Sequence, residues 1–227
     1  MRVINLAGLL LILLLGCSEN EPLMTQPEPE PELNARYKLT FNAGWSAQTH
    51  PNDFPSSAHF SGLIGMTHNG NTMLFAKGGI ASDGIKNMAE TGGKNPLETE
   101  IQNLISIGIG NTLISGGGIN PSPGEVSLEF DIVSSYSMVS VVSMIAPSPD
   151  WFIAVSNINL IENNEWVTSK TITVDIYDAG TDDGATFVSP DEPTIPRAAI
   201  FKIKTPPLAI NNVVAPLGTI TFTKIEQ

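Results

Sequence analysis

The sequence predicts an all-β protein, an antiparallel β-sandwich with two short helical inserts. Three observations lead to this prediction. Apolar residues occur in short runs that alternate with polar residues, which is the period-2 pattern of half-buried strands. Turn-forming residues separate the runs, since the 227-residue chain contains 20 Gly and 17 Pro residues. Only two segments carry the 3.6-residue spacing of helices, so helices are expected as inserts in a strand framework.

The expected strands follow one another from residue 37 to residue 225. The segment 126–133 shows the clearest pattern, because every even-numbered residue from Val126 to Ile132 is apolar. The segment 136–145 is apolar on both parities at several positions, which is typical of a strand covered on both faces. Further strands are expected at 37–41, 60–67, 72–75, 151–161, 166–167, 171–177, 200–203 and 218–225.

Two segments between the early and middle strands carry helical signals. Residues 81–90 place Ile85 and two later apolar residues on one face, with Ser82 in the N-cap position. Residues 96–107 begin with Pro96, continue with acidic residues in the first turn, and then present an apolar face. These segments are the two expected inserts.

The charge balance excludes one class of partner. The chain has a formal net charge of −12 and only 11 Lys and Arg residues, which form no cluster. A nucleic-acid-binding surface needs a basic stripe that neutralises phosphates, so nucleic acid is not an expected partner. The acidity is typical of a solvated surface.

The N-terminus indicates export and attachment to a membrane. Residues 1–16 combine a short positive start with a ten-residue apolar run at 6–15, which is too short to span a membrane and is typical of a signal peptide. The run ends in Leu14-Leu15-Gly16-Cys17, which resembles the lipobox of bacterial lipoproteins. That resemblance implies lipidation of Cys17, and Ser18 after it fits an outer-membrane destination. We therefore expect a lipid-anchored protein of the cell envelope.

The residues after the lipobox are expected to form a spacer. Residues 17–34 alternate Pro with Glu, which favours an extended, solvated chain and buries nothing. Residues 35–227 then form one domain. Because Cys17 is the only cysteine, the domain has no disulfide, no thiolate metal site and no Cys nucleophile.

An acidic loop follows the expected strand 171–177. Asp178 and Asp182 stand four residues apart, and Gly180 and Gly184 allow the backbone to fold back on itself. Crowded carboxylates repel each other unless a cation or protons neutralise them. Calcium takes six to eight oxygen ligands, including carboxylates. The loop is therefore a candidate calcium loop, while ordinary turn formation by Asp and Gly remains the alternative.

A third carboxylate is expected at the same end of the domain. Asp150 follows Pro149 and precedes the strand 151–161, whereas Asp178 follows the strand 171–177. If these strands are antiparallel neighbours, both acids lie at one end of the sandwich. Asp150, Asp178 and Asp182 would then surround one point.

Short segments spread over residues 36–225 also match a known family in their residues and their order. They are Phe41-Asn42-Ala43-Gly44-Trp45-Ser46, 49–51, 60–65, 79–86, 142–151, 178–184, 189–190 and 193–196. In these segments the chain resembles the spondin N-terminal domain. The resemblance implies a sandwich similar to the calcium-dependent lipid-binding domains. It also implies one calcium ion held by aspartates at the positions of Asp150, Asp178 and Asp182.

The resemblance implies only some of the family's functions for this chain. Animal members of this family are secreted matrix or adhesion proteins, and several bind cell-surface receptors. This chain departs from them in its lipobox, in the absence of cysteines from the domain, and in having no thrombospondin-type repeats after it. Calcium binding therefore carries over to named residues, whereas receptor binding does not.

Other candidate sites have weaker signals. His50, His59 and His68 could form a zinc set, but no two share a helical face and no carboxylate motif accompanies them. They are expected to be loop and surface residues. Trp45, Trp151 and Trp166 are expected to be core or rim residues, and no sequence motif of a hydrolase or a nucleotide loop is present.

Together these observations predict a calcium-binding, lipid-anchored, non-enzymatic domain for adhesion or ligand binding at the cell surface. The partner is expected to be a protein or a glycan, and the sequence leaves its identity and the oligomeric state open. The alternatives are an envelope hydrolase that uses the acidic loop and a purely structural surface protein.

Overall fold

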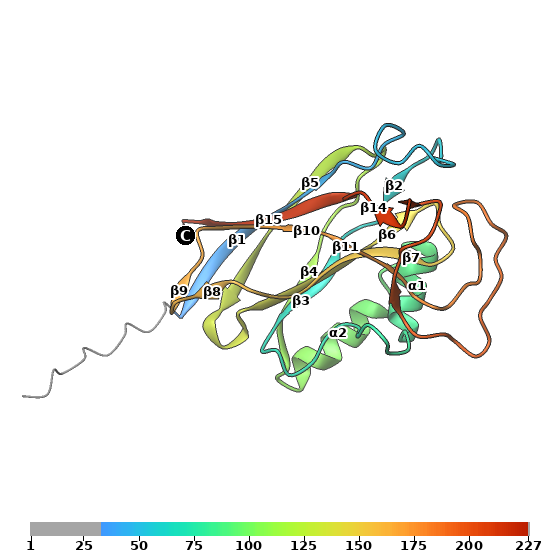
Figure 1. Ribbon diagram of the computed structural model, residues 1–227. Helices are drawn as coiled ribbons and strands as arrows, with labels where there is room; N and C mark the ends of the chain where they lie inside the picture. The colour runs from blue at the N-terminus through green and yellow to red at the C-terminus, as the bar shows by residue number, and fades with distance from the viewer. Residues whose placement is uncertain (1–32, 227) are drawn as a thin grey trace, which may run out of the picture.

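The computed structural model describes residues 33–226 and consists mainly of two antiparallel sheets packed face to face (Figure 1). The prediction of an all-β sandwich with two short helical inserts is confirmed. The predicted signal peptide, Cys17 and all of the predicted spacer except its last two residues lie outside the described residues.

The smaller sheet has four strands in the order β10-β15-β1-β5. These strands are β10 (Ser169–Thr173), β15 (Gly218–Ile225), β1 (Asn34–Ala43) and β5 (Gly124–Val133). In the central strand β1, Leu39 pairs with Phe222 on one side and with Leu128 on the other. Alternate residues of β1 are buried, as the period-2 pattern predicts.

The larger sheet has the order β12-β11-β7-β6-β3-β4, and β2 also pairs with β6. These strands are β12 (Phe201–Lys202), β11 (Asp175–Asp178), β7 (Trp151–Asn159), β6 (Met138–Ala146), β3 (Ile64–His68), β4 (Gly110–Ser115) and β2 (His59–Phe60). Two small hairpins and a 3₁₀ turn complete the structure. They are β8 (Ile161–Glu162) with β9 (Glu165–Trp166), β13 (Ala209–Ile210) with β14 (Val213–Val214), and η1 (Ser134–Tyr136).

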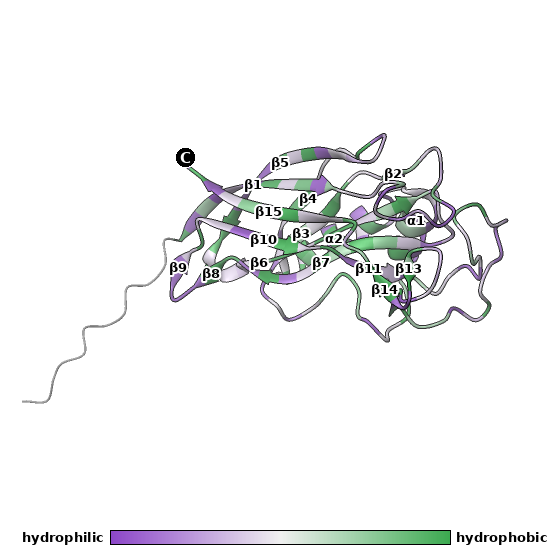
Figure 2. Cartoon of the chain, turned by 45° about the horizontal axis from the view of Figure 1, so that its top comes forward, coloured by the Kyte–Doolittle hydropathy of each residue, from purple (hydrophilic) through white to green (hydrophobic). Residues whose placement is uncertain are grey.

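The larger sheet is covered on both faces. One face packs against the smaller sheet in a core that includes Val139 and Val141 of β6. The other face packs against the helices in a second core that includes Val142 and Met144 of the same strand. Figure 2 shows hydrophobic residues concentrated on the strands. The prediction of a strand covered on both faces is thus confirmed for β6.

The helices α1 (Asp83–Thr91) and α2 (Leu97–Ser106) lie against the outer face of the larger sheet (Figure 1). The predicted N-cap is confirmed, because the Ser82 hydroxyl accepts a hydrogen bond from the Ile85 amide at 3.1 Å. Glu100 of α2 joins the two helices, since its carboxylate accepts from the Ser82 hydroxyl at 2.6 Å and from the Gly84 amide at 2.8 Å.

The predicted strand 171–177 is divided between the two sheets. Residues up to Thr173 pair with β15 in the smaller sheet, and residues from Asp175 pair with β7 in the larger sheet. Val174 stands between them and is buried in the core. Strands that change sheets form the corners of sandwiches, and this one brings Asp178 into the larger sheet between β7 and β12.

The predicted strand at 72–75 is wrong, because Leu74 and Phe75 are buried as loop residues in the core under the helices. The predicted strand at 60–67 is interrupted and forms the separate strands β2 and β3. Residues 110–115, for which the sequence predicts no strand, form the edge strand β4. An edge strand that is only partly buried lacks a continuous apolar alternation, so the pattern does not reveal it.

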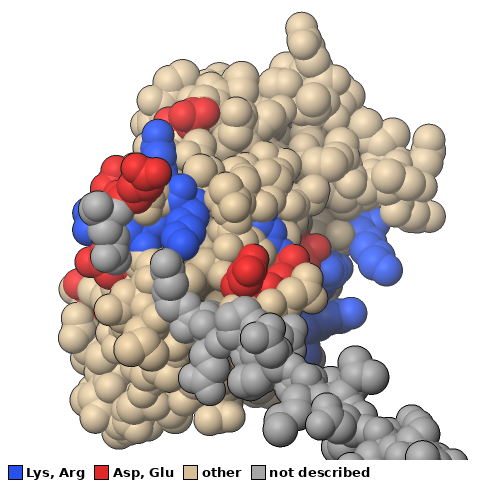
Figure 3. Space-filling model, turned by 90° about the vertical axis from the view of Figure 1, so that its left-hand side faces the viewer, with Lys and Arg blue, Asp and Glu red and all other residues tan. Residues whose placement is uncertain are grey.

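The two ends of the sandwich differ in what they carry. The described chain enters at the start of β1 and leaves at the end of β15, and these two points lie at the same end, since Arg36 pairs with Ile225 (Figure 1). We call this the terminal end. The loops that follow β6 and β11 lie at the opposite end, which we call the loop end. At the terminal end, basic and acidic side chains lie next to one another (Figure 3). None of the described helices has the length and hydropathy needed to cross a membrane.

Candidate metal centre

The pairing of β7 with β11 brings the predicted acids together. The two strands are antiparallel, and Asp178 lies opposite Trp151 in the register. The backbone amide of Ala179 donates to the carbonyl of Asp150 at 3.1 Å, which extends the contact past the strand ends. The prediction that Asp150 and Asp178 lie at the same end of neighbouring strands is therefore confirmed.

Asp150 is a fully buried carboxylate at the centre of this end, with 0% of its surface exposed. Its Oδ2 accepts hydrogen bonds from the Thr181 amide at 2.7 Å, the Asp182 amide at 3.2 Å and the Thr181 hydroxyl at 3.3 Å. Its Oδ1 is buried and has no hydrogen-bond partner. A buried charged oxygen without a partner is costly, so a proton or a cation at this atom would stabilise the folded chain.

Asp178 closes the first turn of the acidic loop. Its Oδ1 accepts from the Gly180 amide at 2.8 Å. Gly180 has a φ of 70°, and a Cβ at this position would lie 2.5 Å from the carbonyl oxygen of Ala198. Only glycine fits this left-handed backbone and this close approach without strain. The sequence signal from Gly180 is therefore explained by a turn that points the Asp178 carboxylate inward.

Asp182 fastens the loop to the segment that returns toward β12. Its Oδ1 accepts from the Gly184 amide and its Oδ2 from the Glu192 amide, both at 2.8 Å. Backbone hydrogen bonds from Asp183 to Glu192 and from Thr194 to Thr181 hold the same two segments together. Asp182 is 5% exposed, so its charge lies in a largely dehydrated position.

The pKa values of these carboxylates reflect their burial and their closeness to one another. Burial, together with the nearby charges of Asp150 and Asp182, raises the pKa of Asp178 to about 7, against hydrogen bonds from Gly180 and the Trp151 side chain. Burial also raises the pKa of Asp150, against its hydrogen bonds from Thr181 and Asp182. None of the ion pairs formed by the described residues involves these three aspartates. Their charges are therefore not balanced by any basic side chain in this part of the chain.

The donor atoms at this end can be compared with those that a metal ion requires. Within residues 33–226, no three His, Cys, Asp or Glu side chains stand in a ready-made metal-binding arrangement. The donor set nevertheless fits a hard cation, because it consists only of oxygens and includes the unpartnered Oδ1 of Asp150. Asp150, Asp178 and Asp182 remain predicted ligands.

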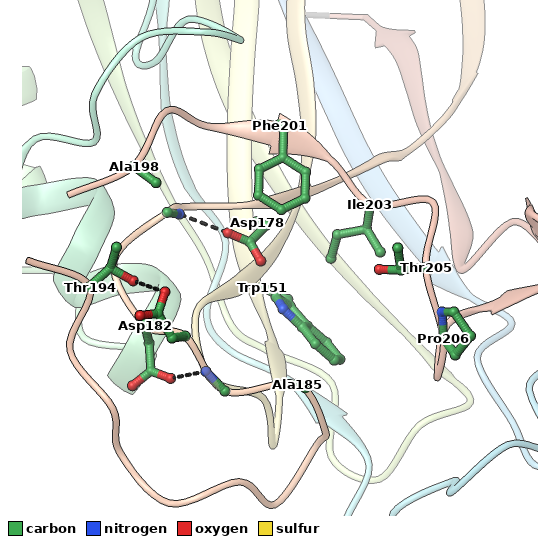
Figure 4. A pocket seen from close by; sticks show the side chains of 13 residues that line it. Trp151, Asp178, Asp182, Ala185, Thr194, Ala198, Phe201, Ile203, Thr205 and Pro206 are labelled. Carbon is green, nitrogen blue, oxygen red and sulfur yellow. Dashed lines mark hydrogen bonds between the residues drawn. The ribbon is translucent and has the colours of Figure 1, made fainter.

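A cavity of about 350 Å³ opens beside the aspartates (Figure 4). Asp178, Asp182 and Asp183 line one side of it, and Thr194 donates a hydrogen bond to Asp183 at 2.7 Å. The other side is mainly apolar, with the hydroxyl group of Thr205 between Ile203 and Pro206. Its apolar part is formed by Trp151, Phe201, Ile203 and Pro206.

The histidines do not form a site, and part of their predicted placement is wrong. His50 and His68 are buried, with exposures of 1% and 0%, and are not surface residues. The ring of His50 hydrogen-bonds to the Ala215 carbonyl and the Thr49 hydroxyl. His68 hydrogen-bonds to the Ser140 hydroxyl at 2.9 Å and accepts from the Gly70 amide at 3.1 Å. These rings satisfy core polar groups, which sequence spacing alone does not show.

The tryptophans are core residues, as predicted. Trp45, Trp151 and Trp166 are between 0% and 7% exposed.

Sequence reasoning missed the residues that support the aspartates. Thr181 holds Asp150 through both its amide and its hydroxyl, yet its sequence position indicates only a spacer between acids. Phe201 forms the apolar wall of the cavity from a strand that pairs with β11, since Phe201 lies opposite Asp178. The run 200–203 predicts a strand there, but no local signal indicates which strand it pairs with.

The fold and the loop end define an antiparallel β-sandwich module with a buried acidic centre at one end. The family model Spondin_N matches residues 35–213, and the chain belongs to this family, the spondin N-terminal domains. Spondin-2 of Rattus norvegicus is 30% identical over 235 residues, which cover 96% of this chain and 70% of that protein. Spondin-1 of Rattus norvegicus is 38% identical over 174 residues, covering 73% of this chain but only 21% of the relative.

Proposed function

We propose that the chain is a calcium-binding, lipid-anchored, non-enzymatic domain that mediates adhesion or ligand binding at the cell surface. The observation that carries the calcium part is the buried Oδ1 of Asp150, which has no partner in a centre whose three carboxylates have no basic counterpart among the described residues. A bound calcium ion would supply the missing positive charge. Asp150, Asp178 and Asp182 would hold it, and the loops that bear them would be fixed in place.

A binding role is supported over a catalytic one by the way the carboxylates are engaged. A general acid or base has to come within hydrogen-bond reach of its substrate. Asp150 is fully buried, and both oxygens of Asp182 accept backbone hydrogen bonds. These groups are arranged to hold the loops. Membership of the spondin family agrees with the proposal of a binding domain.

The geometry of the chain supports presentation of the loop end to an external partner. The described chain begins at the terminal end, opposite the aspartates (Figure 1). A lipid on Cys17 would attach the domain from that side, so the loop end would face away from the membrane. Replacing Cys17 by Ser should move the protein from the membrane fraction to the soluble fraction. A variant that stays in the membrane fraction would contradict the anchor.

The calcium proposal is tested by thermal unfolding of the full-length chain with calcium and with chelator. At about 10 mM calcium, which is 100-fold above a Kd of about 10⁻⁴ M, the melting temperature should rise by about 5–10 °C. Asp150→Asn keeps an acceptor for the Thr181 and Asp182 amides but removes the charge, so it should abolish this rise. Asp131→Asn, at the terminal end, is the matched control and should retain it. An equal calcium response in both variants would overturn the proposal.

A further inference from the structure

The cavity beside the aspartates has two chemically different walls. One wall carries Asp178, Asp182 and Asp183, and the other is mainly apolar and carries Trp151, Phe201, Ile203 and Pro206 together with the hydroxyl group of Thr205 (Figure 4). Its volume of about 350 Å³ lies at the lower end of the range of ligand pockets, about 300–1,000 Å³. We propose that this cavity binds a neutral carbohydrate whose hydroxyl groups contact the cation held by the aspartates. This inference rests on the proposed calcium site.

The balance of charge determines which ligands the cavity accepts. Every charged residue that lines it is an aspartate, and the lining includes no Lys, Arg or His. With the buried Asp150 behind them, the carboxylates outnumber the charges of one divalent cation by two. An anionic ligand, such as a phosphate or a carboxylate, would therefore be repelled. A cationic group would be repelled by the metal ion that it has to contact. A neutral ligand is favoured on both counts.

Hydrogen-bonding capacity then selects the kind of neutral group. The carboxylates of Asp178, Asp182 and Asp183 can only accept hydrogen bonds when ionised. A hydroxyl group offers lone pairs to a cation and at the same time donates its proton to a neighbouring carboxylate. A peptide group divides these roles between its carbonyl, which can approach the cation, and its N–H, which points the opposite way, so one peptide group cannot do both. Ligands with several adjacent hydroxyls fit this wall better than a peptide does.

The apolar wall completes the match to a sugar ring. Phe201 is 45% exposed and lines the cavity, so part of its ring is open to a ligand there. It stands opposite Asp178 in the register of β12 with β11, so an aromatic face and a carboxylate border the same opening. A pyranose presents hydroxyl groups at its edges and C–H groups on its faces. Such a ring can direct hydroxyls to the aspartate wall while its carbon face packs on Phe201 and Pro206.

The test uses saturation-transfer-difference NMR on the full-length chain. The probes are methyl glycosides of mannose, glucose, galactose and fucose, and an uncharged blocked dipeptide serves as the competing class. Melting curves with calcium and with chelator are recorded on the same samples. We expect at least one glycoside to give a signal in calcium that disappears in chelator. In Phe201→Ala this signal should fall at least tenfold, whereas Ile195→Ala, an exposed apolar residue outside the cavity, should retain it.

The outcomes separate the two proposals. If calcium leaves the melting temperature unchanged, the proposed calcium site fails, and the carbohydrate inference fails with it. If calcium raises the melting temperature but no glycoside binds, the calcium site stands and the carbohydrate inference is overturned. The carbohydrate inference is also overturned if the glycoside signal persists in chelator, if Phe201→Ala retains it, or if only the dipeptide binds.

Discussion

The two ends of the sandwich handle acidic residues in opposite ways. At the terminal end, Arg36 pairs with Glu129 at 3.2 Å and with Asp131 at 3.0 Å, and all three side chains are substantially exposed. At the loop end, Asp150 and Asp182 are buried and are held by backbone amides, with no described basic side chain paired to them. Acidic side chains at the terminal end are thus paired with a basic side chain and screened by water. The buried aspartates at the loop end have no basic side chain paired with them among the described residues.

This difference indicates where stability and function are located. An exposed ion pair contributes about 0–1 kcal/mol because water already screens both charges. A buried charge without a counter-charge is unfavourable by several kcal/mol unless something neutralises it. The loop end therefore keeps an unfavourable arrangement that a bound cation would relieve. The proposed cation site is therefore at the loop end, whereas the ion pairs of Arg36 at the terminal end are those of an ordinary surface.

The largest effect is expected from Asp150→Ala. The change removes the acceptor of three hydrogen bonds, from the Thr181 amide, the Thr181 hydroxyl and the Asp182 amide. In calcium we expect a loss of about 2–4 kcal/mol in the free energy of unfolding, because buried donors are left unpaired. In chelator the loss should be smaller, since the variant also removes a buried, uncompensated charge. Urea denaturation in both conditions measures the difference, and equal losses would contradict a cation at this end.

A second prediction concerns the two buried histidines, one at each end, and is tested on His68. Burial lowers the pKa of His68 at the terminal end and of His50 at the loop end. The unfolded chain takes up protons near pH 6.5 while the folded chain does not, so the folded state should lose stability as the pH falls below about 6.5. Protonation of His68 would also remove the acceptor of the Gly70 amide.

The effect of His68 on the pH dependence of stability is obtained by comparing the wild type with a variant that lacks this histidine. Asp178, whose pKa is raised to about 7, changes the stability in the opposite direction. Its contribution to the free energy of unfolding is lost as the pH rises from the unfolded-state pKa toward about 7. Unfolding is therefore measured in wild type and His68→Gln at about pH 7 and about pH 5. The wild type should lose more stability than the variant on acidification. An identical loss in both would show that His68 is not protonated selectively in the unfolded chain.

Much of this fold could be predicted from the sequence, because its strands carry strong local patterns. The limits of β15 and the burial of β6 on both faces follow from alternation and apolar runs. The division of 171–177 at Val174 could not be predicted, because one continuous alternating run serves two sheets. The edge strand β4 was hidden by its glycine-rich flanks. Sheet membership depends on long-range pairing, which local periodicity does not encode.

The aspartates of the candidate site could be predicted from the sequence, but the residues that hold them in place and line the cavity could not. Asp and Gly spacing indicated the loop, and strand order indicated that Asp150 would join it. The unpartnered oxygen of Asp150 and the apolar wall with Phe201 depend on three-dimensional packing. Calcium binding itself remains a prediction.

The smallest effect is expected at the terminal end, from Arg36→Ala. The variant breaks both ion pairs of Arg36, yet it should lower the free energy of unfolding by less than about 1 kcal/mol. Because exposed charges are screened by salt, even this loss should shrink at high ionic strength. Urea denaturation at low and high salt measures it, with and without calcium. A loss as large as that of Asp150→Ala, or one that depends on calcium, would remove the distinction between the two ends. A small, salt-sensitive and calcium-independent loss would support the distinction, because the charges at the terminal end would then behave as ordinary exposed ion pairs.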